Sequence, residues 1–271
     1  RTFVIPSGLV QDGWLDAIEI IPGNDDIVHH VVISYDPTGT GAQQDANDPG
    51  EGFQSTGGGL VDGAKFVAAW APGGGPLWVP NGFAQRLEAG GDFLIEFHYP
   101  AGTLGQTDQT TVNLHYSDDP TPREVWYNPI LVHAPGILDQ NFLFIPANQT
   151  ATFTETYNVP YDVTLIGCFP HMHLIGRSIS SWAELSDGST EPLISVPNWR
   201  FKWQLSYNYP QLIPIPQGTQ LRAEAFYDNT SANPYNPNNP PQLVIAGEET
   251  GDEMMIVFYC YTYYVNGDEN I

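Results

Sequence analysis

The sequence predicts an all-β protein made of two antiparallel β-sandwiches of jelly-roll type. Short runs rich in β-branched and aromatic residues are bounded by Gly, Pro, Asn and Asp, as strands bounded by turns usually are. The 27 glycines and 24 prolines supply many turns, and no long stretch has the period of an amphipathic helix. Hydrophobic residues make up 41% of the 271 residues, which favours packed cores over disorder.

The expected strands and loops follow one another along the whole chain. Strand-like runs cover residues 26–33, 93–99, 161–168, 220–227 and 254–265. Residues 36–63 and 228–242 are expected to be long exposed loops, which either shape a site or, more commonly, are tolerated insertions. The polar, proline-rich residues 117–123 look like a linker. We therefore expect an N-terminal sandwich over residues 1–120 and a C-terminal one over 121–271.

The charge limits the kinds of partner. Thirty-one acidic residues against eight basic ones give a formal net charge of −23, and such a surface repels nucleic acid and anionic membranes. Adaptation to a saline habitat explains this balance better than an acidic docking face. The chain begins at Arg1 without Met and has no apolar run long enough for a transmembrane helix, so we expect a processed form without membrane insertion.

The most informative pattern is His171-Met172-His173, followed downstream by Asp252-Glu253-Met254. Side chains alternate between the two faces of a strand, so His171 and His173 point the same way and can bind one ion. A thioether ligand suits copper, above all Cu(I), and suits zinc, calcium or magnesium poorly. Two imidazoles and the Met254 thioether therefore predict a redox-active copper site.

A second group of histidines lies upstream. His29 and His30 are adjacent, and His98 ends the run 93–98. Adjacent residues on a regular strand face opposite ways, so His29 and His30 can share an ion only where the backbone is irregular. Three imidazoles suit copper, zinc or nickel, so this group alone predicts a metal without identifying it.

These motifs together resemble those of the copper type II, ascorbate-dependent monooxygenases, the family of peptidylglycine α-hydroxylating monooxygenase and dopamine β-monooxygenase. The resemblance spans nearly the whole chain and is that of a divergent, bacterial-type member. The matching motifs occur in the family's order: Val28-His29-His30, Ala69-Trp70-Ala71, Pro80-Asn81-Gly82, Phe97-His98-Tyr99, His171-Met172-His173-Leu174-Ile175-Gly176, and Asp252-Glu253-Met254 with Tyr263-Tyr264 behind it.

The resemblance implies two coppers per chain, one on each domain, facing each other across an open cleft. His29, His30 and His98 would hold the copper that stores and delivers an electron. The catalytic copper would be held by His171, His173 and Met254, with Met255 packing on the other side of its strand. Ascorbate or another one-electron donor would reduce both coppers, and dioxygen would hydroxylate an sp³ C–H bond of a small-molecule substrate. Such chemistry implies a secreted or periplasmic protein.

The chain departs from the peptide-hydroxylating branch at three positions. In that branch an Arg, an Asn and a Tyr hold the peptide carboxylate, whereas Phe169, Ile256 and Phe258 stand at the matching positions here. None of these side chains can pair with a carboxylate. We therefore expect a more apolar, aromatic substrate pocket and a neutral or aromatic substrate.

The two cysteines lie on the strands that must meet at the catalytic site. Cys168 precedes His171 and Cys260 follows Met254, which favours a disulfide between them. On regular strands Cys168 would face away from His171, whereas Cys260 would face the same way as Met254. A disulfide between the two cysteines therefore requires a β-bulge, and Pro170 is its expected position. The family's usual disulfides do not map onto these positions.

Two other kinds of protein fit some of the same residues. A cupredoxin-like electron carrier would use Cys168, His171, His173 and Met254 at one copper, but it leaves the upstream histidines unexplained. A non-catalytic metal-storage module would have closed sites and would consume no oxygen. A polysaccharide-cleaving copper enzyme needs an N-terminal His, and the chain begins with Arg1.

Overall fold

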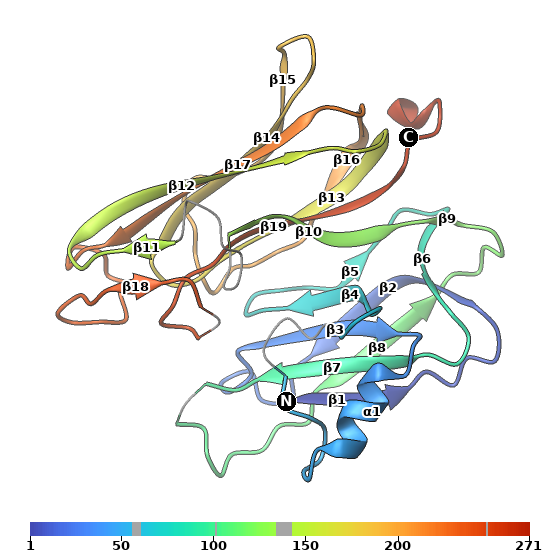
Figure 1. Cartoon of the computed structure of the whole chain (residues 1–271), viewed down its shortest axis with the longest axis horizontal. Helices are drawn as coiled ribbons and strands as arrows, with labels where there is room; N and C mark the ends of the chain where they lie inside the picture. Colours follow the sequence, from blue (N-terminus) through green and yellow to red (C-terminus); the bar gives the residue numbers. More distant parts are fainter. Residues whose placement is uncertain (56–60, 101, 134–142, 248) are drawn as a thin grey trace. The chain divides into compact units, whose positions relative to one another are not determined.

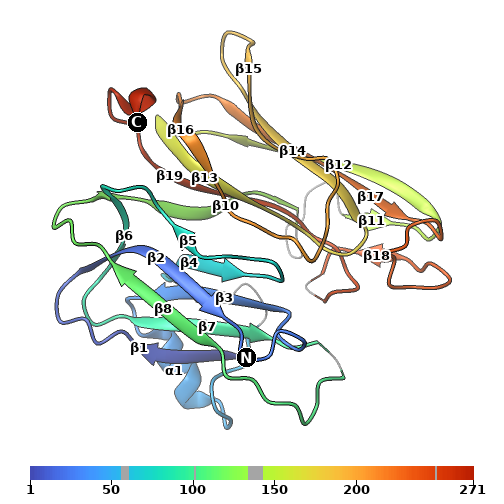
Figure 2. The ribbon, with the colours of Figure 1, turned by 180° about the vertical axis from the view of Figure 1, so that it is seen from behind.

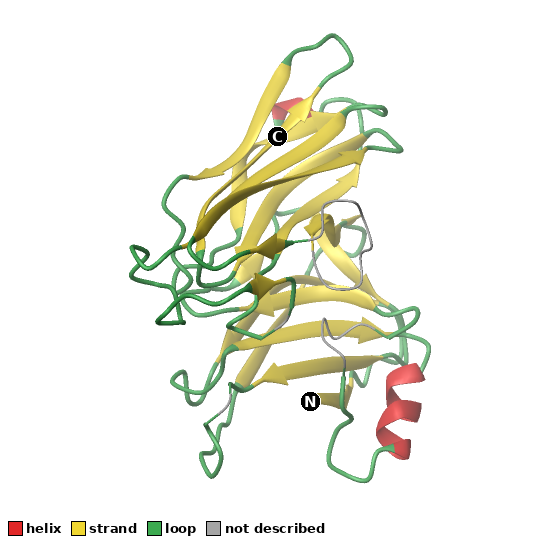
Figure 3. Ribbon diagram, turned by 60° about the vertical axis from the view of Figure 1, so that its left-hand side comes forward, coloured by secondary structure: helices red, strands yellow, loops and turns green. Residues whose placement is uncertain are grey.

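The protein is nearly all-β, as the sequence predicts (Figure 3). The structure, a computed structural model, describes residues 1–55, 61–100, 102–133, 143–247 and 249–271. It divides into two compact units, Arg1–Tyr127 and Asn128–Ile271. The first unit extends past the expected linker because the short strand β9 (Arg123–Glu124) pairs in parallel with β6 (Phe83–Leu87).

The first unit contains two sheets. One has the strand order β1-β7-β3-β4, and the other has the order β5-β2-β6-β9 with β8 also paired to β2. The one α-helix of the described residues, α1 (Thr40–Asn47), lies beside β1 (Figure 1) within the stretch expected to be a loop. The remaining strands are β1 (Thr2–Pro6), β2 (Gly13–Ile21), β3 (His30–Asp36), β4 (Lys65–Trp70), β5 (Leu77–Trp78), β7 (Asp92–His98) and β8 (Thr111–Tyr116).

Both sheets of the first unit contribute to one hydrophobic core. Ile18 of β2 packs in the same cluster as Ile33 of β3, Val67 of β4 and Phe93 of β7. The central strand β3 pairs on both edges, with β4 and with β7. The residues at the start of β3 and the end of β7 are therefore held by pairing and by the core.

The second unit also contains two four-stranded sheets, with the orders β10-β19-β13-β16 and β12-β17-β14-β15, and a two-stranded sheet of β11 and β18. Strands β14 and β15 form an antiparallel hairpin (Figure 2). A 3-10 turn, Asp268–Asn270, follows the last strand. The strands are β10 (Trp126–His133), β11 (Phe144–Ile145), β12 (Gln149–Asn158), β13 (Val163–Met172), β14 (Gly176–Glu184), β15 (Thr190–Val196), β16 (Tyr207–Ile215), β17 (Gln220–Asn229), β18 (Val244–Ile245) and β19 (Met255–Tyr263).

Strand β19 shows how the two faces of its sheet differ. From Met255 to Tyr259 its side chains alternate between buried positions in the core and half-buried positions on the other face. Met255, Val257 and Tyr259 belong to the core cluster, which also contains side chains from β14 and β17 of the facing sheet. The intervening Ile256 and Phe258 lie on the outer face of the sheet.

The bulge in β13 is not at Pro170, where the sequence analysis placed it. The register between β13 and β19 shifts between Leu165 and Gly167, whereas Pro170 lies directly opposite Val257 in regular pairing. Pairing with β16 on the other edge ends at Cys168. Pro170 therefore needs no backbone donor on that edge, which is where a strand tolerates proline.

The predicted disulfide between Cys168 and Cys260 is wrong. Both side chains are buried and the two sulfurs are not bonded to each other. Cys168 lies opposite Tyr259, and Cys260 lies opposite Gly167, one position along the ladder. Neighbouring positions of a ladder face opposite sides of the sheet, so the two thiols point away from each other.

We expect thiol titration of the protein, unfolded without reductant, to find two reactive thiols per chain. The physical reason is the opposite orientation of Cys168 and Cys260 across their sheet. The folded protein should react slowly, since both side chains are almost fully buried. Finding no thiol in the unfolded, unreduced protein would contradict the observed register.

The described residues contain no helix that is both long enough and apolar enough to span a membrane.

Candidate metal sites

The first candidate site is formed by His29, His30 and His98. One ring nitrogen from each residue can be chosen so that all three lie within 4.8 Å of one another. The Nδ1 atoms of His29 and His30 are 3.0 Å apart. The ring of His98 is edge-on to both, with centroid distances of 4.8 Å to His29 and 4.7 Å to His30. The structure thus brings together all three histidines that the sequence analysis grouped.

The strand ends explain how adjacent histidines reach one place. His30 is the first residue of β3 and lies directly opposite His98, the last residue of β7. Directly opposite residues share a face, so these two rings meet. His29 precedes the strand, and its backbone N–H donates to the His98 carbonyl at 2.9 Å. Strict alternation does not apply there, so the His29 ring can turn toward the other two.

This donor set fits a transition metal. Ligand nitrogens lie about 2.0–2.1 Å from a bound zinc ion, so two of them on one ion are roughly 3–4 Å apart. The separations among the three rings require only small side-chain adjustments to meet that condition. Three imidazoles suit copper, zinc or nickel, so this cluster could bind a metal but does not choose among these.

The second candidate site contains His171 and His173. Their ring centroids are 5.1 Å apart at an interplanar angle of 80°. The Nδ1 of His171 donates to Oε1 of Gln204 at 2.7 Å, and the Nδ1 of His173 donates to the carbonyl of Asp252 at 3.1 Å. Because a proton sits on each Nδ1, the Nε2 lone pair is the one available for a metal. Burial lowers the pKa of His171, although the Gln204 bond opposes this, and the neutral ring is the ligand form.

The loop between β15 and β16 holds these imidazoles in place. Gln204 is buried, and its Nε2 donates to the Phe201 carbonyl at 2.7 Å, which fixes the amide so that Oε1 faces His171. The ring of Phe201 meets His173 edge-on at 6.2 Å. The indole of Trp199 donates to the His173 carbonyl at 3.0 Å. The sequence analysis missed this loop because nothing local marks Gln204 as a partner of a histidine 33 positions away.

The ladder between β13 and β19 gives the position of Met254. His171 lies opposite Ile256 and Met172 lies opposite Met255. The ladder ends there, and continued by one position it would set His173 opposite Met254, on the face that carries His171. Met255 is fully buried in the core on the opposite face. The register therefore excludes Met255 from the side of the histidine pair, and its continuation would direct Met254 there.

Glu253 joins the two halves of this site. It is fully buried, and one carboxylate oxygen accepts the backbone N–H groups of Ile175 and Gly176 at 2.8 Å and 3.2 Å. The other oxygen accepts those of His173 and Met254 at 2.8 Å and 3.2 Å. Burial raises the pKa of Glu253 to about 8, against the opposing effect of these donors. The carboxylate thus links the turn after His173 to the segment that carries Met254, a role the motif alone did not reveal.

An apolar strip lies next to His171 on the outer face. Phe169 is two positions before His171 on β13 and directly opposite Phe258 of β19. The Phe169 ring is 5.8 Å from Phe258 and 6.4 Å from His171, centroid to centroid. Ile256 lies opposite His171 itself. The three positions expected to line a substrate pocket therefore adjoin one another and one of the histidines.

No family model matches the chain. The chain is 23% identical over 266 residues to "DBH-like monooxygenase protein 2" of Mus musculus, across 91% of this chain and 40% of that protein. The chain thus spans about 40% of the relative's length. This distant similarity agrees with the family resemblance of the sequence motifs.

The solved structures that align with the chain do so only weakly. A structure of the Gx strain of infectious bursal disease virus aligns with a TM-score of 0.23 and 14% identity, over 98% of this chain and 58% of that one. Oxalate decarboxylase from Bacillus subtilis aligns with a TM-score of 0.16 and 9% identity, over 96% and 66%. TM-scores this low do not establish a shared fold.

Proposed function

We propose that the protein is a copper-dependent monooxygenase. It hydroxylates an sp³ C–H bond of a small neutral or aromatic substrate, with dioxygen and a one-electron donor such as ascorbate. The observation that carries the proposal is a pair of imidazoles whose Nδ1 atoms are already hydrogen-bonded, at the end of a β13–β19 register whose continuation would bring the Met254 thioether to the same face. The similarity to a mouse protein named as a monooxygenase supports the same reaction class.

His171, His173 and Met254 would hold the catalytic copper, which when bound supplies the one-electron chemistry and dioxygen activation that hydroxylation requires. The partners of the histidines keep the ring nitrogens oriented: Gln204 fixes one ring, and the Asp252 carbonyl fixes the other. Such partners tune both ligand orientation and metal affinity. His29, His30 and His98 would hold the second copper, whose three imidazoles support both oxidation states.

The substrate class follows from the side chains next to His171. Phe169, Ile256 and Phe258 offer apolar and aromatic surface and no hydrogen-bond donor. A carboxylate buried among them would lose its water without gaining a partner, which costs several kcal/mol. A neutral or aromatic carbon skeleton fits this strip better, and glycine-extended peptides are expected to be poor substrates.

A non-catalytic copper-binding protein is the alternative function. The cupredoxin-like form of it is disfavoured because Cys168 lies on the core face, opposite Tyr259, and not on the face of His171. Burial also raises the pKa of the Cys168 thiol to about 11, whereas a copper ligand must be the thiolate. A storage module remains as the competing proposal, and it predicts no oxygen consumption.

The test begins with copper loading followed by an oxygen electrode. We expect two coppers per chain. With ascorbate, oxygen uptake should be coupled to hydroxylated product for some member of a panel of neutral and aromatic small molecules, and not for a glycine-extended peptide. The matched control is His115→Ala, which removes an exposed histidine bonded to Asp16 and should leave copper content and turnover unchanged.

Two outcomes would count against the proposal. One copper per chain would remove one of the two sites. Two tightly bound coppers without coupled uptake on any substrate class would favour the storage module.

A further inference from the structure

Two arginines of the second unit flank one tyrosine ring. The Arg177 guanidinium carbon is 5.5 Å from the centroid of the Tyr235 ring, and that of Arg200 is 4.8 Å from it. Both distances are within the range of cation–π attraction. The arrangement brings two positive charges to one ring.

Neither arginine has a carboxylate partner within the described part of the chain, although acidic residues outnumber basic ones by 31 to 8. Arg200 makes only a long bond of 3.4 Å to the carbonyl of its neighbour Trp199. Nη1 of Arg177 is buried and has no hydrogen-bond partner among the described residues. A buried unpaired guanidinium N–H is costly, and it indicates a position where an acceptor is missing.

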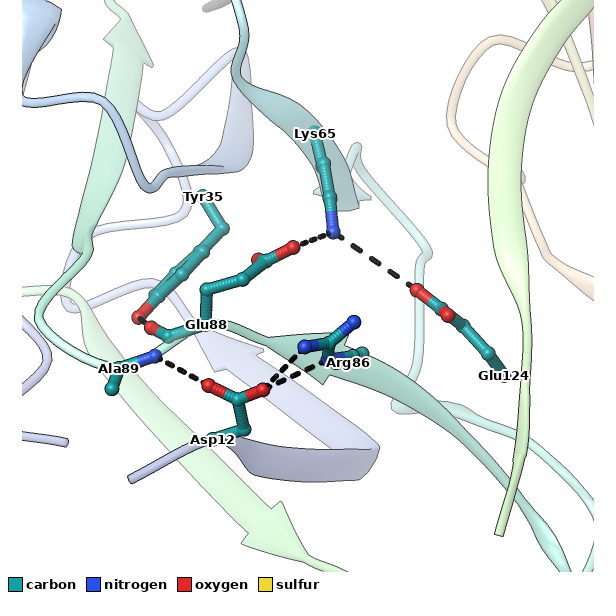
Figure 4. Close-up of polar contacts among 7 residues, drawn as sticks. All are labelled: Asp12, Tyr35, Lys65, Arg86, Glu88, Ala89 and Glu124. Carbon is teal, nitrogen blue, oxygen red and sulfur yellow. Dashed lines mark hydrogen bonds and ion pairs between the residues drawn. The ribbon is translucent and has the colours of Figure 1, made fainter. Parts of the chain in front are cut away.

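Four of the other six basic side chains pair with a carboxylate. Arg86 bonds Asp12 through Nε at 3.0 Å and Nη2 at 2.5 Å, and Lys65 pairs with Glu88 (Figure 4). Arg1 pairs with Asp48, and Arg222 pairs with Glu184. Arg177 and Arg200 therefore depart from the pattern.

Local structure positions all three side chains. Arg177 is the extra residue of a β-bulge, because the register of β14 on β17 shifts between Gly176 and Ser178. Bulges redirect a side chain and are frequent beside active sites. The carbonyl of Arg177 accepts the backbone N–H of Trp199 at 2.8 Å, so the bulge is joined to the loop that carries Arg200.

Tyr235 comes from the long loop 228–242, which the sequence analysis left as either a site element or an insertion. Asparagine side chains fix this loop. Asn229 donates to the Gln242 carbonyl at 2.7 Å, and Oδ1 of Asn233 accepts the Tyr235 backbone N–H at 3.0 Å. Tyr235 is 44% exposed, so a small solute can reach its ring and the flanking guanidinium groups.

We propose that Arg177, Arg200 and Tyr235 form a binding site for the oxyanion group of a small molecule, a carboxylate or a phosphate. Guanidinium groups present several N–H donors in a plane that matches these anions. Chloride has no such directional acceptors, so it should bind much more weakly. The site is separate from the strip of Phe169, Ile256 and Phe258, but it is built on the bulge and loop that adjoin His173. The proposal does not depend on bound copper.

The experiment follows the arginine Nε–Hε signals by NMR in copper-free protein during titration with inorganic phosphate and, separately, with benzoate. We expect saturable shifts of Arg177 and Arg200 with at least one of the two anions. Saturation by phosphate alone assigns the site to phosphate groups, and saturation by benzoate alone assigns it to carboxylates. Arg177→Gln and Arg200→Gln should each weaken binding by about tenfold or more.

Tyr235 offers a matched pair of variants. Tyr235→Phe keeps the ring and should leave the affinity within about twofold, whereas Tyr235→Ala removes the platform and should weaken binding several-fold. Arg86→Gln, which removes an arginine already paired with Asp12, is the control and should have no effect.

The proposal is overturned if neither anion binds saturably, if the double variant of Arg177 and Arg200 binds as the wild type does, or if sodium chloride shifts the signals equally. Should Arg177→Gln fail to fold, Arg200→Gln decides, because that side chain is exposed. Because the titration is carried out without copper, its failure leaves the monooxygenase proposal standing.

Discussion

Replacing Met254 by isoleucine should abolish oxygen-dependent turnover while the protein stays folded. The β13–β19 register, continued by one position, would set Met254 opposite His173 on the face of the histidine pair, so its thioether is the sulfur ligand that we propose for the copper. Disturbing partners of metal ligands alone costs about 10- to 100-fold in affinity or activity, so loss of a ligand should cost on the order of 100-fold or more. X-ray absorption on the reduced, copper-loaded variant should no longer show a sulfur scatterer.

The adjacent Met255 gives a matched control with the same chemical change. Met255 is fully buried in the core on the other face of β19. A substitution by isoleucine there changes packing at nearly constant volume, which costs less than about 1.5 kcal/mol of unfolding free energy. Met255→Ile should therefore keep the sulfur scatterer and most of the turnover. If Met255→Ile instead removed the sulfur signal, the assignment of the two faces would be wrong.

The all-β class could be predicted because composition and strand-like runs report it locally. The histidine groups could be predicted for a similar reason: His171 and His173 share a face in any regular strand, and His98 ends a run that sequence alone marks as a strand. The sequence does not show that the rings of His29 and His30 lie together. They can do so because β3 begins at His30, so His29 precedes the strand and is not bound by its alternation of faces.

Features set by pairing between distant strands could not be predicted. Whether Cys168 and Cys260 face each other depends on a bulge at Leu165–Gly167, and moving that bulge by a few residues changes the answer. No local pattern marks Gln204 as the partner of His171, since the contact arises only when the loop after β15 folds back. Likewise, the stacking of Arg177 and Arg200 on Tyr235 joins three segments that have no common motif.

Glu253 is the clearest residue whose role appears only in three dimensions. In the sequence Glu253 stands between Asp252 and Met254. In the structure its two oxygens accept four backbone N–H groups from both segments of the candidate catalytic site. A carboxylate supplies acceptors on both oxygens, and no other side chain of the same shape does so.

Glu253→Gln should therefore destabilise the second unit and loosen the site. The amide keeps the shape but has only one accepting oxygen, so two buried N–H donors would face an NH₂ group. Leaving a buried donor unsatisfied costs about 1–3 kcal/mol, so for two donors a loss of roughly 2–6 kcal/mol in the free energy of unfolding is expected. Urea unfolding at about pH 9, where a Glu253 carboxyl with a pKa of about 8 is ionised, measures it. Glu224→Gln, at an exposed position of β17, is the control expected to change stability by no more than about 0.5 kcal/mol.

The Glu253→Gln variant should change the copper affinity of one candidate metal site and not of the other. Glu253 bonds the backbone of His173 and Met254, which both belong to the second unit. Copper affinity should therefore fall at the His171–His173 site and stay unchanged at the site of His29, His30 and His98, as competition with a copper chelator would show. Equal weakening of both sites, or a stability equal to that of the wild type, would mean that the carboxylate does not link the two segments as its hydrogen bonds indicate.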